Sequence, residues 1–213
     1  MLKSIIEKER LVSTSREPHA LATDGKTFWV SSRVTRHVDV VKRAGWRKTG
    51  ELAPPGMAWG MTYAHGDVVM TCGEGADDDR WLRHYHGGQL VGKALQCPDF
   101  TGSHLSAIDG KLLLGQWYNK KLLVLRDDGT IERAYDTPHQ VCGVAVVDGA
   151  AFVLGTDEEK DGAYYITRVD LATGKAADVA DVPFRARGLA WDGTSFWTNH
   201  READRTVNFA LPD

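Results

Sequence analysis

Short apolar stretches alternate with polar turns along the chain, and their length and spacing favour strands over helices. The segment "HLSAIDGKLLLGQWYNKKLLVLRDDGT", from His104 to Thr130, illustrates the pattern. It contains an apolar run, Asp-Gly, a second apolar run, Asn-Lys, a third apolar run and Asp-Asp-Gly. Asp-Gly between two apolar runs is the strongest short-range signal for a hairpin. The segment therefore predicts an antiparallel sheet of short strands.

The same pattern recurs along the chain. Four further segments begin with an apolar strand, turn at a glycine and continue with a second apolar strand: "HALATDGKTFWVSS", "GMTYAHGDVVMTC", "GVAVVDGAAFVLG" and "GLAWDGTSFWTNH". The turn glycines are Gly25, Gly66, Gly110, Gly149 and Gly193, at intervals of 41, 44, 39 and 44 residues. A period near 40 residues with units built of strands is typical of propeller blades.

Third and fourth strands follow in each unit except the last, where the chain stops after the third. The segment "SIIEKERLVS" at residues 4–13 is available as the missing strand. We therefore predict a single all-β domain over residues 1–213, a five-bladed β-propeller with four-stranded antiparallel blades, closed by the N-terminal strand joining the last blade. The predicted blades are 18–55, 57–98, 102–138, 139–183, and 184–211 with 4–13.

The inner strands favour this fold over its main alternative. "KLLLG", "AAFVLG" and "VAVV" are continuously apolar, as expected for strands covered on both faces by neighbouring blades. The alternative is a β-sandwich of about twenty short strands, which has no reason to repeat every ~40 residues.

Composition narrows the function classes. The chain has 213 residues, 42% hydrophobic and 26% charged, with a net charge of −3, which argues against general nucleic-acid binding. Three widely spaced cysteines and a charged N-terminal segment without an apolar core favour a reducing compartment and no signal peptide. No apolar run approaches the length of a membrane span. The expected location is the cytoplasm, with no membrane and no nucleic-acid partner.

Up-and-down strands predict which side chains share one face of the ring. Residues just before each first strand and just after each second strand should gather there, around the axis. As catalytic candidates we take His19, Glu74, His104 and His200. As substrate-binding candidates we take Arg33, Trp59, Gln116, Trp117, Cys142, Arg187 and Asn199. A funnel lined by aromatic, imidazole and charged groups is a usual site for a small-molecule ligand.

Several chemistries are compatible with this set. His19, His104 and His200, with oxygen donors from Glu74 or Asp157, are candidate ligands for a divalent metal ion, but no H-E-x-x-H or calcium-loop pattern requires one. No G-x-S-x-G elbow supports a serine nucleophile. Acid–base chemistry by His104 or His19 with a nearby carboxylate needs the fewest additional assumptions. The cofactor stays open.

Two units resemble known propeller families. "PHALATDGKTFWVSS" and "SHLSAIDGKLLLGQWYNKKLLVL" resemble blades of the streptogramin (virginiamycin B) lyase, NHL and gluconolactonase group, which usually have six or seven blades. In the lyase branch a histidine and a glutamate on the top face act with a divalent metal in ring-opening elimination. His104, in "SHLSA", occupies a comparable context.

A second resemblance matches the blade number. "WGMTYAHGDVVMTCGEGADDDRWLRHY" is similar to the first motif of the plant-type glutaminyl cyclases, which are five-bladed propellers. "GQWYNKKLLVL" resembles their Leu-Thr-Trp-Lys motif and places Trp117 on the matching tryptophan. The family's catalytic glutamate would fall at Met70, with Glu74 four residues further on, and Trp59 stands where the family has glutamine.

Two hypotheses for function follow. The first is an enzyme that processes a small molecule in the axial funnel by acid–base lyase, isomerase, cyclase or ring-opening chemistry. The alternative is a non-catalytic propeller that binds a small ligand or a protein partner.

Overall fold

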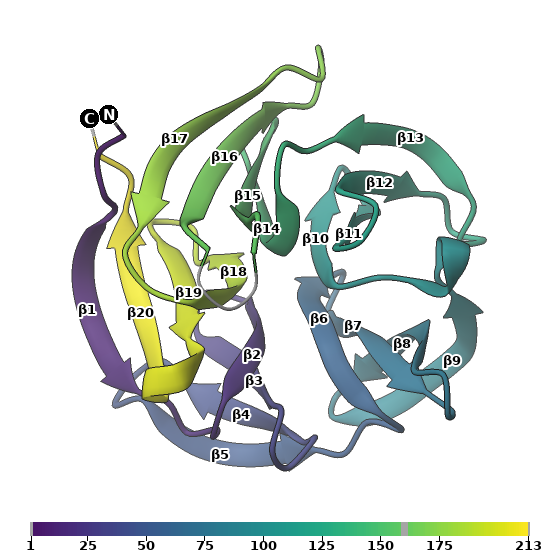
Figure 1. The fold of residues 1–213 in the computed structure, drawn as a ribbon. Helices are drawn as coiled ribbons and strands as arrows, with labels where there is room; N and C mark the ends of the chain where they lie inside the picture. The colour runs from purple at the N-terminus through teal and green to yellow at the C-terminus, as the bar shows by residue number, and fades with distance from the viewer. Residues whose placement is uncertain (1, 159–161, 213) are drawn as a thin grey trace.

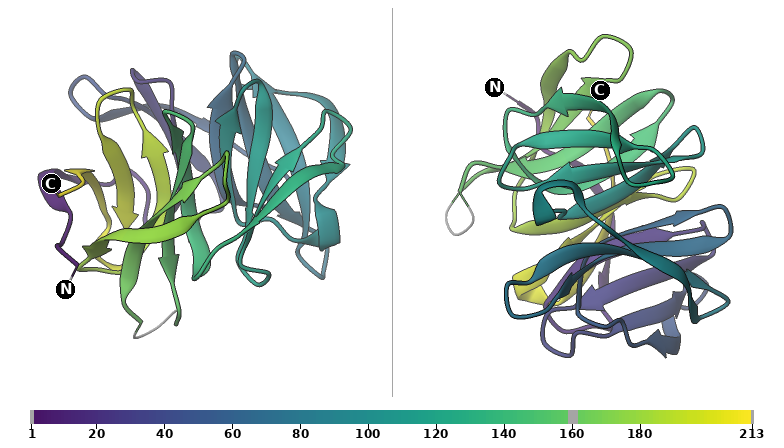
Figure 2. Two further views of the ribbon diagram at one scale, coloured as in Figure 1. Left: turned by 90° about the horizontal axis from the view of Figure 1, so that it is seen from above. Right: turned by 90° about the vertical axis from the view of Figure 1, so that its right-hand side faces the viewer.

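The computed structural model describes residues 2–158 and 162–212, and these residues form five four-stranded antiparallel sheets. The first strand of each sheet contacts the first strands of both neighbouring sheets, so that the sheets close into a ring. Figure 1 looks down on this ring, and the side views of Figure 2 show the sheets standing beside one another around it. The chain is a five-bladed β-propeller, as predicted.

The strands of each blade follow one another from the axis outward. Blade 1 contains β2 (Pro18–Thr23), β3 (Thr27–Ser32), β4 (Val38–Lys42) and β5 (Arg47–Leu52). Blade 2 contains β6 (Met57–Ala64), β7 (Asp67–Glu74), β8 (Asp79–His86) and β9 (Gln89–Gln96). Blade 3 contains β10 (His104–Ile108), β11 (Lys111–Gln116), β12 (Lys121–Leu125) and β13 (Ile131–Asp136). Blade 4 contains β14 (Gln140–Val147), β15 (Ala150–Thr156), β16 (Tyr164–Asp170) and β17 (Ala176–Val182). Blade 5 contains β18 (Ala186–Trp191), β19 (Phe196–His200), β20 (Arg205–Ala210) and β1 (Ile6–Val12).

The two ends of the chain build the last blade together. Strand β1 pairs antiparallel with β20, from Ile6 opposite Ala210 to Val12 opposite Arg205, and Figure 1 shows the termini side by side. Blade 1 holds the closing strand from the other side, because the Trp46 indole N–H donates to the Val12 carbonyl at 2.8 Å. The predicted closure of the ring by the N-terminal strand is confirmed.

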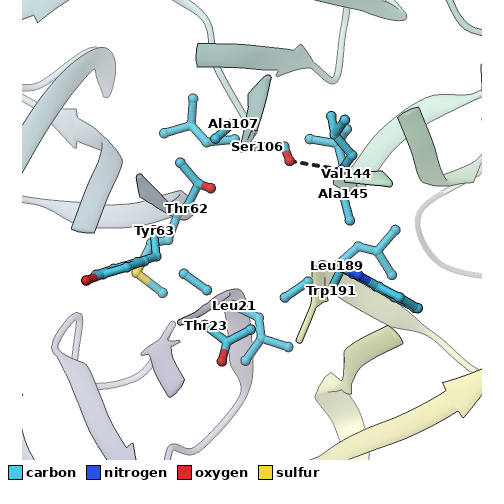
Figure 3. Close-up of a pocket in the computed structure, with 15 residues that line it drawn as sticks. Leu21, Thr23, Thr62, Tyr63, Ser106, Ala107, Val144, Ala145, Leu189 and Trp191 are labelled. Atoms are coloured by element: carbon cyan, nitrogen blue, oxygen red, sulfur yellow. Dashed lines mark hydrogen bonds between the residues drawn. The ribbon is translucent and has the colours of Figure 1, made fainter. Parts of the chain in front are cut away.

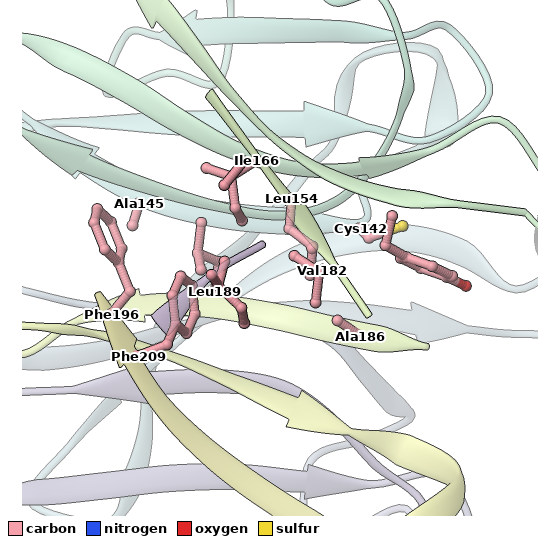
Figure 4. Close-up of a cluster of buried hydrophobic side chains, with 12 residues drawn as sticks. Cys142, Ala145, Leu154, Ile166, Val182, Ala186, Leu189, Phe196 and Phe209 are labelled. Carbon is pink, nitrogen blue, oxygen red and sulfur yellow. The ribbon is translucent and has the colours of Figure 1, made fainter. Parts of the chain in front are cut away.

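The core lies between the blades. One cluster joins blades 4 and 5, where Leu154 and Ile166 face Phe196 and Phe209 (Figure 4). Complete burial of such a side chain stabilises the fold by about 1.5–3 kcal/mol. Outer strands are exposed along most of their length, as in β9 and β13. Burial therefore decreases from the axis outward, which explains why the inner strands are continuously apolar.

The glycine turns adopt more than one geometry. In blades 3 and 4, both turn residues have positive φ: 45° and 81° at Asp109 and Gly110, and 48° and 73° at Asp148 and Gly149. This is the arrangement that two-residue hairpins favour. In blade 1 the Asp24 carboxylate instead accepts from two backbone N–H groups further along the turn. These turns bring every second strand back toward the face where the first strands begin.

Helical structure is confined to two short segments in the described ranges, the 3₁₀ turns η1 (Pro98–Phe100) and η2 (Arg201–Ala203). A search of the same residues finds no helix with the length and apolar character needed to cross a membrane.

Candidate active site on the top face of the ring

A pocket of about 220 Å³ opens on the face where the first strands begin, which we call the top face. Its lining comes from blades 1, 2, 3 and 5 and the loops between their strands. The residues of this top pocket are His19, Arg33, Trp59, Asp78, Arg80, Ser103, His104, Trp117, Tyr118 and Arg187. The four blades meet here because the pocket lies around the axis of the ring.

Irregular strand pairing positions two of these side chains. In β6 the ladder passes from Ala58 opposite Cys72 to Gly60 opposite Thr71, so Trp59 has no partner on β7. The pairing of β2 shifts similarly around His19, between Pro18 and Leu21. Such β-bulges redirect side chains and are over-represented next to active sites. The bulges thus turn His19 and Trp59 out of the regular alternation.

Two glycines allow the strands that carry the histidines to approach closely. A Cβ atom on Gly60 would lie 2.5 Å from the Cα atom of His104, and one on Gly188 would lie 2.6 Å from the His19 carbonyl oxygen. Gly188 also has a φ of +69°, which favours glycine. Only a residue without a side chain fits at these positions, so the glycines determine how deep the two imidazoles lie.

His19 and His104 are buried next to each other at the base of the pocket. Their ring centroids are 5.7 Å apart and the rings are nearly parallel, while Trp59 meets the His19 ring edge-on at 5.1 Å. Burial, followed by the positive charge of Arg187, lowers the pKa of His104 to about 3. Burial and the neighbouring His104 hold the pKa of His19 well below its usual range. Both rings are therefore neutral at physiological pH.

An arginine side chain lies over one face of each of two aromatic rings in the lining. The Arg80 guanidinium lies 4.7 Å from the Trp59 ring centroid and forms a 2.8 Å ion pair with Asp78. The Asp78 carboxylate also accepts from the Trp59 indole at 3.2 Å. Cation–π contacts of this kind hold an arginine flat against its ring.

Arg187 lies deepest among the arginines of the pocket. It is 2% exposed, and its guanidinium lies 5.1 Å from the Trp117 ring centroid. It donates to the Tyr164 hydroxyl at 2.8 Å and to the carbonyl of Ala186, and it contacts the Cys142 sulfur at 3.5 Å. These contacts fix a positive charge near the histidine pair, where it helps to lower the pKa of both imidazoles.

Two atoms at this site lack hydrogen-bond partners. Over residues 2–158 and 162–212, three buried side-chain nitrogen or oxygen atoms have none: Thr14 Oγ1, His19 Nδ1 and Arg80 Nε. Two of the three belong to residues that line the top pocket. Because buried polar groups are almost always paired, an unpaired group calls for a specific explanation. A ligand in the pocket would supply one.

The structure brings together six of the eleven residues selected from the sequence. These are His19, Arg33, Trp59, His104, Trp117 and Arg187. The described lining does not include Glu74, Gln116, Cys142, Asn199 or His200.

Glu74 and His200 are engaged elsewhere. The Glu74 carboxylate accepts two hydrogen bonds from Arg83 of the neighbouring strand β8, at 2.8 and 2.6 Å. The His200 ring stacks on Phe184 at 4.6 Å, and its Nδ1 lies 2.8 Å from an Arg10 nitrogen of the outermost strand β1. Both side chains lie at the expected height along the axis but point toward outer strands.

Gln116 and Asn199 are buried behind the pocket and support it. The Gln116 amide donates to the carbonyls of Pro98 and Thr101 and so holds the turn before β10. The Asn199 amide donates to the His19 carbonyl at 3.1 Å and accepts from Thr206 at 2.9 Å. Asn199 is thus a positioning residue that ties the last blade to His19. Cys142 is buried under Arg187, as described above.

Four residues of the pocket are not among the eleven selected from the sequence: Asp78, Arg80, Ser103 and Tyr118. Asp78 and Arg80 belong to "GADDDRW", which reads as a solvated acidic loop, yet β8 begins there on the top face. Tyr118 follows Trp117 directly and is 80% exposed. The sequence did contain one signal for Arg80: it follows an acidic run directly, at the start of a third strand.

A metal site is not supported by the geometry. Within the described ranges, no three His, Cys, Asp or Glu residues gather so that they could hold a metal ion. His19 and His104 lie together, but His200 is at the outer side of blade 5. We therefore derive no chemistry through a metal.

The opposite end of the axis has a different lining. A cavity of about 150 Å³ lies there, which we call the lower cavity, and Figure 3 shows its side chains around an open centre. Its wall is made of short or apolar side chains such as Thr62, Ser106, Ala107 and Ala145. The Ser106 hydroxyl accepts a hydrogen bond from the Val146 N–H at 3.1 Å and so links blades 3 and 4. The described wall of this cavity includes no charged residue.

The fold and the top pocket define a propeller with a small, aromatic and arginine-rich pocket on its axis. A scan against models of protein families finds no match, and a search of curated proteins finds none either.

Solved structures match the fold. A glutaminyl cyclase from Myxococcus xanthus aligns over 91% of this chain and 72% of its own, with 14% identity and a TM-score of 0.51. A Bacteroides caccae protein of unknown function aligns over 86% and 70%, with 11% identity and a TM-score of 0.60. The PQQ-bound aldose sugar dehydrogenase of Streptomyces coelicolor aligns over 98% of both chains, with 14% identity and a TM-score of 0.59. At these identities the likeness shows the fold alone, and at that level the predicted resemblance to propeller families is confirmed.

Proposed function

We propose that this protein is an enzyme that processes a small molecule in the top pocket by acid–base chemistry. The observation that carries the proposal is the buried pair of neutral imidazoles, His19 and His104, at the base of the pocket, with His19 Nδ1 unpartnered. A neutral imidazole can accept a proton at one nitrogen and donate a hydrogen bond from the other. In lyase, isomerase, cyclase and ring-opening reactions, a group of this kind can move a proton at the reacting atom. Because burial and Arg187 depress the pKa of His104 to about 3, this proposal requires a bound substrate whose negative charge raises that pKa toward the working pH.

The surrounding residues take supporting roles in this proposal. Trp59, Trp117 and Tyr118 provide surfaces on which a ring or planar substrate stacks. Arg187 stabilises negative charge that develops over the histidines, as a buried cation does in a water-poor site. A cavity of about 220 Å³ lies below the ~300–1,000 Å³ of drug-sized sites, so the substrate is a small metabolite. This proposal gives Glu74 and His200 no catalytic role, because their side chains contact Arg83 and Arg10 and lie outside the described lining.

The fold neighbours support an enzymatic role without specifying the reaction. A glutaminyl cyclase and a sugar dehydrogenase share the propeller arrangement. Their substrates are not transferred to this chain, since fold alone does not determine function.

The test is turnover of a metabolite panel by the intact chain, followed by His19→Gln and His104→Gln variants. We expect each variant to lose at least about 100-fold in kcat, the size of a typical acid–base contribution, while its circular dichroism stays unchanged. His84→Gln, a half-exposed histidine of β8 outside the pocket, is the matched control and should retain full turnover. Full turnover in both pocket variants would overturn the assignment.

The alternative function is non-catalytic binding of a small ligand or protein partner. It is favoured by one observation: Asp78, the sole carboxylate in the described lining, is already engaged by Arg80 and Trp59. Mass spectrometry separates the two functions, because a binding protein returns its ligand unchanged after prolonged incubation and an enzyme does not.

We further propose the cytoplasm as the site of action. Burial raises the pKa of both the Cys72 and Cys97 thiols to about 12, so these groups stay protonated and unreactive, as suits structural cysteines in a reducing compartment. Retention of activity in a reducing buffer, with no oxidant required for folding, is the expected result.

A further inference from the structure

The charge of the top pocket points to the class of its ligand. Its described lining contains three arginines, Arg33, Arg80 and Arg187, against one carboxylate, Asp78. The Asp78 carboxylate already has partners, because it forms a 2.8 Å ion pair with Arg80 and accepts a hydrogen bond from the Trp59 indole. Both histidines are held neutral by burial. Arg33 therefore has no carboxylate of the described lining to pair with, and Glu17, which lies outside that lining, is its described acidic neighbour.

Arg33 presents its guanidinium at the rim of this pocket. Its backbone N–H donates to the Glu17 carbonyl at 3.3 Å, which fixes the start of the loop between β3 and β4. Its guanidinium lies 3.9 Å from the Glu17 carboxylate, within ion-pair range but too far for a hydrogen bond. The side chain is 39% exposed. A guanidinium in this state can offer two parallel N–H groups to an incoming planar anion.

The unpartnered atoms point to the same chemistry. Arg80 Nε can only donate, so it needs an acceptor oxygen or nitrogen, and His19 Nδ1 is the second atom without a partner. A ligand with two acceptor oxygens, reaching these atoms after small shifts of the side chains over them, satisfies groups that the protein leaves unpaired. An anion in the pocket would also offset the arginine charge that helps to lower the pKa of both histidines.

Resting on the proposed function, we infer that the substrate of the top pocket is a small organic carboxylate with a flat ring or conjugated group. Its carboxylate pairs with Arg33 at the rim, and its planar part stacks against Trp59, Trp117 and Tyr118. A carboxylate fits better than a larger dianion, because the pocket is small and the exposed guanidinium matches two coplanar oxygens.

The test uses three planar probes of nearly the same shape and different charge, together with phenyl phosphate as a larger anion. Benzoate, benzamide, benzamidine and phenyl phosphate are titrated into the full chain at pH 7. Affinity is measured by calorimetry, and the binding site is identified from the indole N–H resonances of Trp59 and Trp117. We expect benzoate to bind at least 10-fold more tightly than benzamide, with benzamidine the weakest and phenyl phosphate no tighter than benzoate.

Two variants test whether Arg33 supplies the positive charge that binds the carboxylate. Arg33→Gln should weaken benzoate at least 10-fold and leave benzamide within 2-fold, whereas Arg36→Gln should change neither by more than 2-fold. Arg36 is the matched control, because it lies on the same exposed loop with the same charge and does not line the pocket.

The outcomes separate this inference from the proposed function. Benzamide or benzamidine binding at Trp59 and Trp117 as tightly as benzoate would overturn the anionic class and leave the pocket as a ligand site. Tighter binding of phenyl phosphate would overturn the carboxylate in favour of a phosphate ester. Equal loss of benzoate affinity in Arg33→Gln and Arg36→Gln would overturn the role of Arg33. If none of the four probes moves the Trp59 and Trp117 signals, the inference fails, while turnover of the metabolite panel still decides the proposed function.

Discussion

The two ends of the propeller axis are built from the same inner strands and differ in almost every respect. At the top, the pairing of β2 and β6 is broken by bulges, and buried histidines lie beside arginine and tryptophan. At the bottom, β2 and β6 pair in regular register, and the cavity is lined by small or apolar side chains such as Ala107 of β10 and Ala145 of β14. Regular pairing is sufficient to hold the ring together. The irregular end is the one that carries the top pocket, where we propose that a ligand binds.

The contrast also separates two uses of small residues. Gly60 and Gly188 at the top are required because the neighbouring backbone leaves no space for a Cβ. Ala107 and Ala145 at the bottom border a cavity of about 150 Å³, where space is available. Small residues at the top end therefore cannot be enlarged without a clash, whereas small residues at the bottom end can.

The largest expected effect comes from adding one heavy atom at each end. Gly60→Ala places a Cβ 2.5 Å from the His104 Cα, so the strands must separate, and we expect a loss of about 3 kcal/mol in the free energy of unfolding. Ala107→Ser at the lower cavity should change it by less than about 0.5 kcal/mol. Urea unfolding measures both. Gly50→Ala, whose Cβ would make ordinary contacts with Val40, controls for the loss of glycine itself; equal losses at Gly60 and Ala107 would contradict the comparison.

A smaller effect appears in the pH dependence of stability. Burial depresses the pKa of His104 from 6.5 to about 3 in the folded protein. The unfolded chain therefore binds a proton that the folded chain does not, and the stabilisation is complete above pH 6.5 and lost as the pH falls toward 3. The loss is about 1.4 kcal/mol per pH unit, or about 2 kcal/mol by pH 5. The free energy of unfolding of His104→Gln should fall less steeply over this range, and Ser106→Ala at the lower cavity should keep the wild-type slope.

The smallest effect concerns the hydrogen bond at the lower cavity. Ser106→Ala removes the acceptor of the Val146 N–H and should cost about 1 kcal/mol of stability. Affinity for benzoate at the top pocket should not change, because the two sites lie at opposite ends of the strands. Thermal melting and calorimetry on the same samples measure the two quantities, and a coupled loss of affinity would show that the ends are not independent.

The architecture was predictable because its signals are local and repeated. Glycine turns at intervals of 39 to 44 residues set the number of blades, and the missing last strand required the segment around Ile6. The height of each side chain along the axis followed from counting strands. Counting therefore placed His19, His104 and Arg187 on one face of the ring, where the structure has them line the top pocket.

The direction in which a side chain points could not be predicted by counting strands. Glu74 ends its strand at the top, but Arg83 on the adjacent strand attracts its carboxylate outward. Bulges shift the alternation of side chains by one residue, but β2 and β6 are buried on both faces, so their sequences have no polar–apolar alternation in which the shift would show. In the sequence, Arg80 stands next to an acidic loop with no sign of a site, and only the structure shows that β8 brings its guanidinium over the Trp59 ring.

The seam between β1 and β20 determines how the molecule would respond to mechanical tension. Pulling outward on Leu2 and Pro212 would first strain the bridge of Ser4 to Asp181 and the pair of Ile6 and Ala210, which lie nearest the two ends. The remaining rungs would then open one at a time rather than together, as in a zipper. The hydrogen bond from the Trp46 indole to the Val12 carbonyl would be the last contact of this strand to break, so the closing strand would separate before the paired strands within the other four blades do.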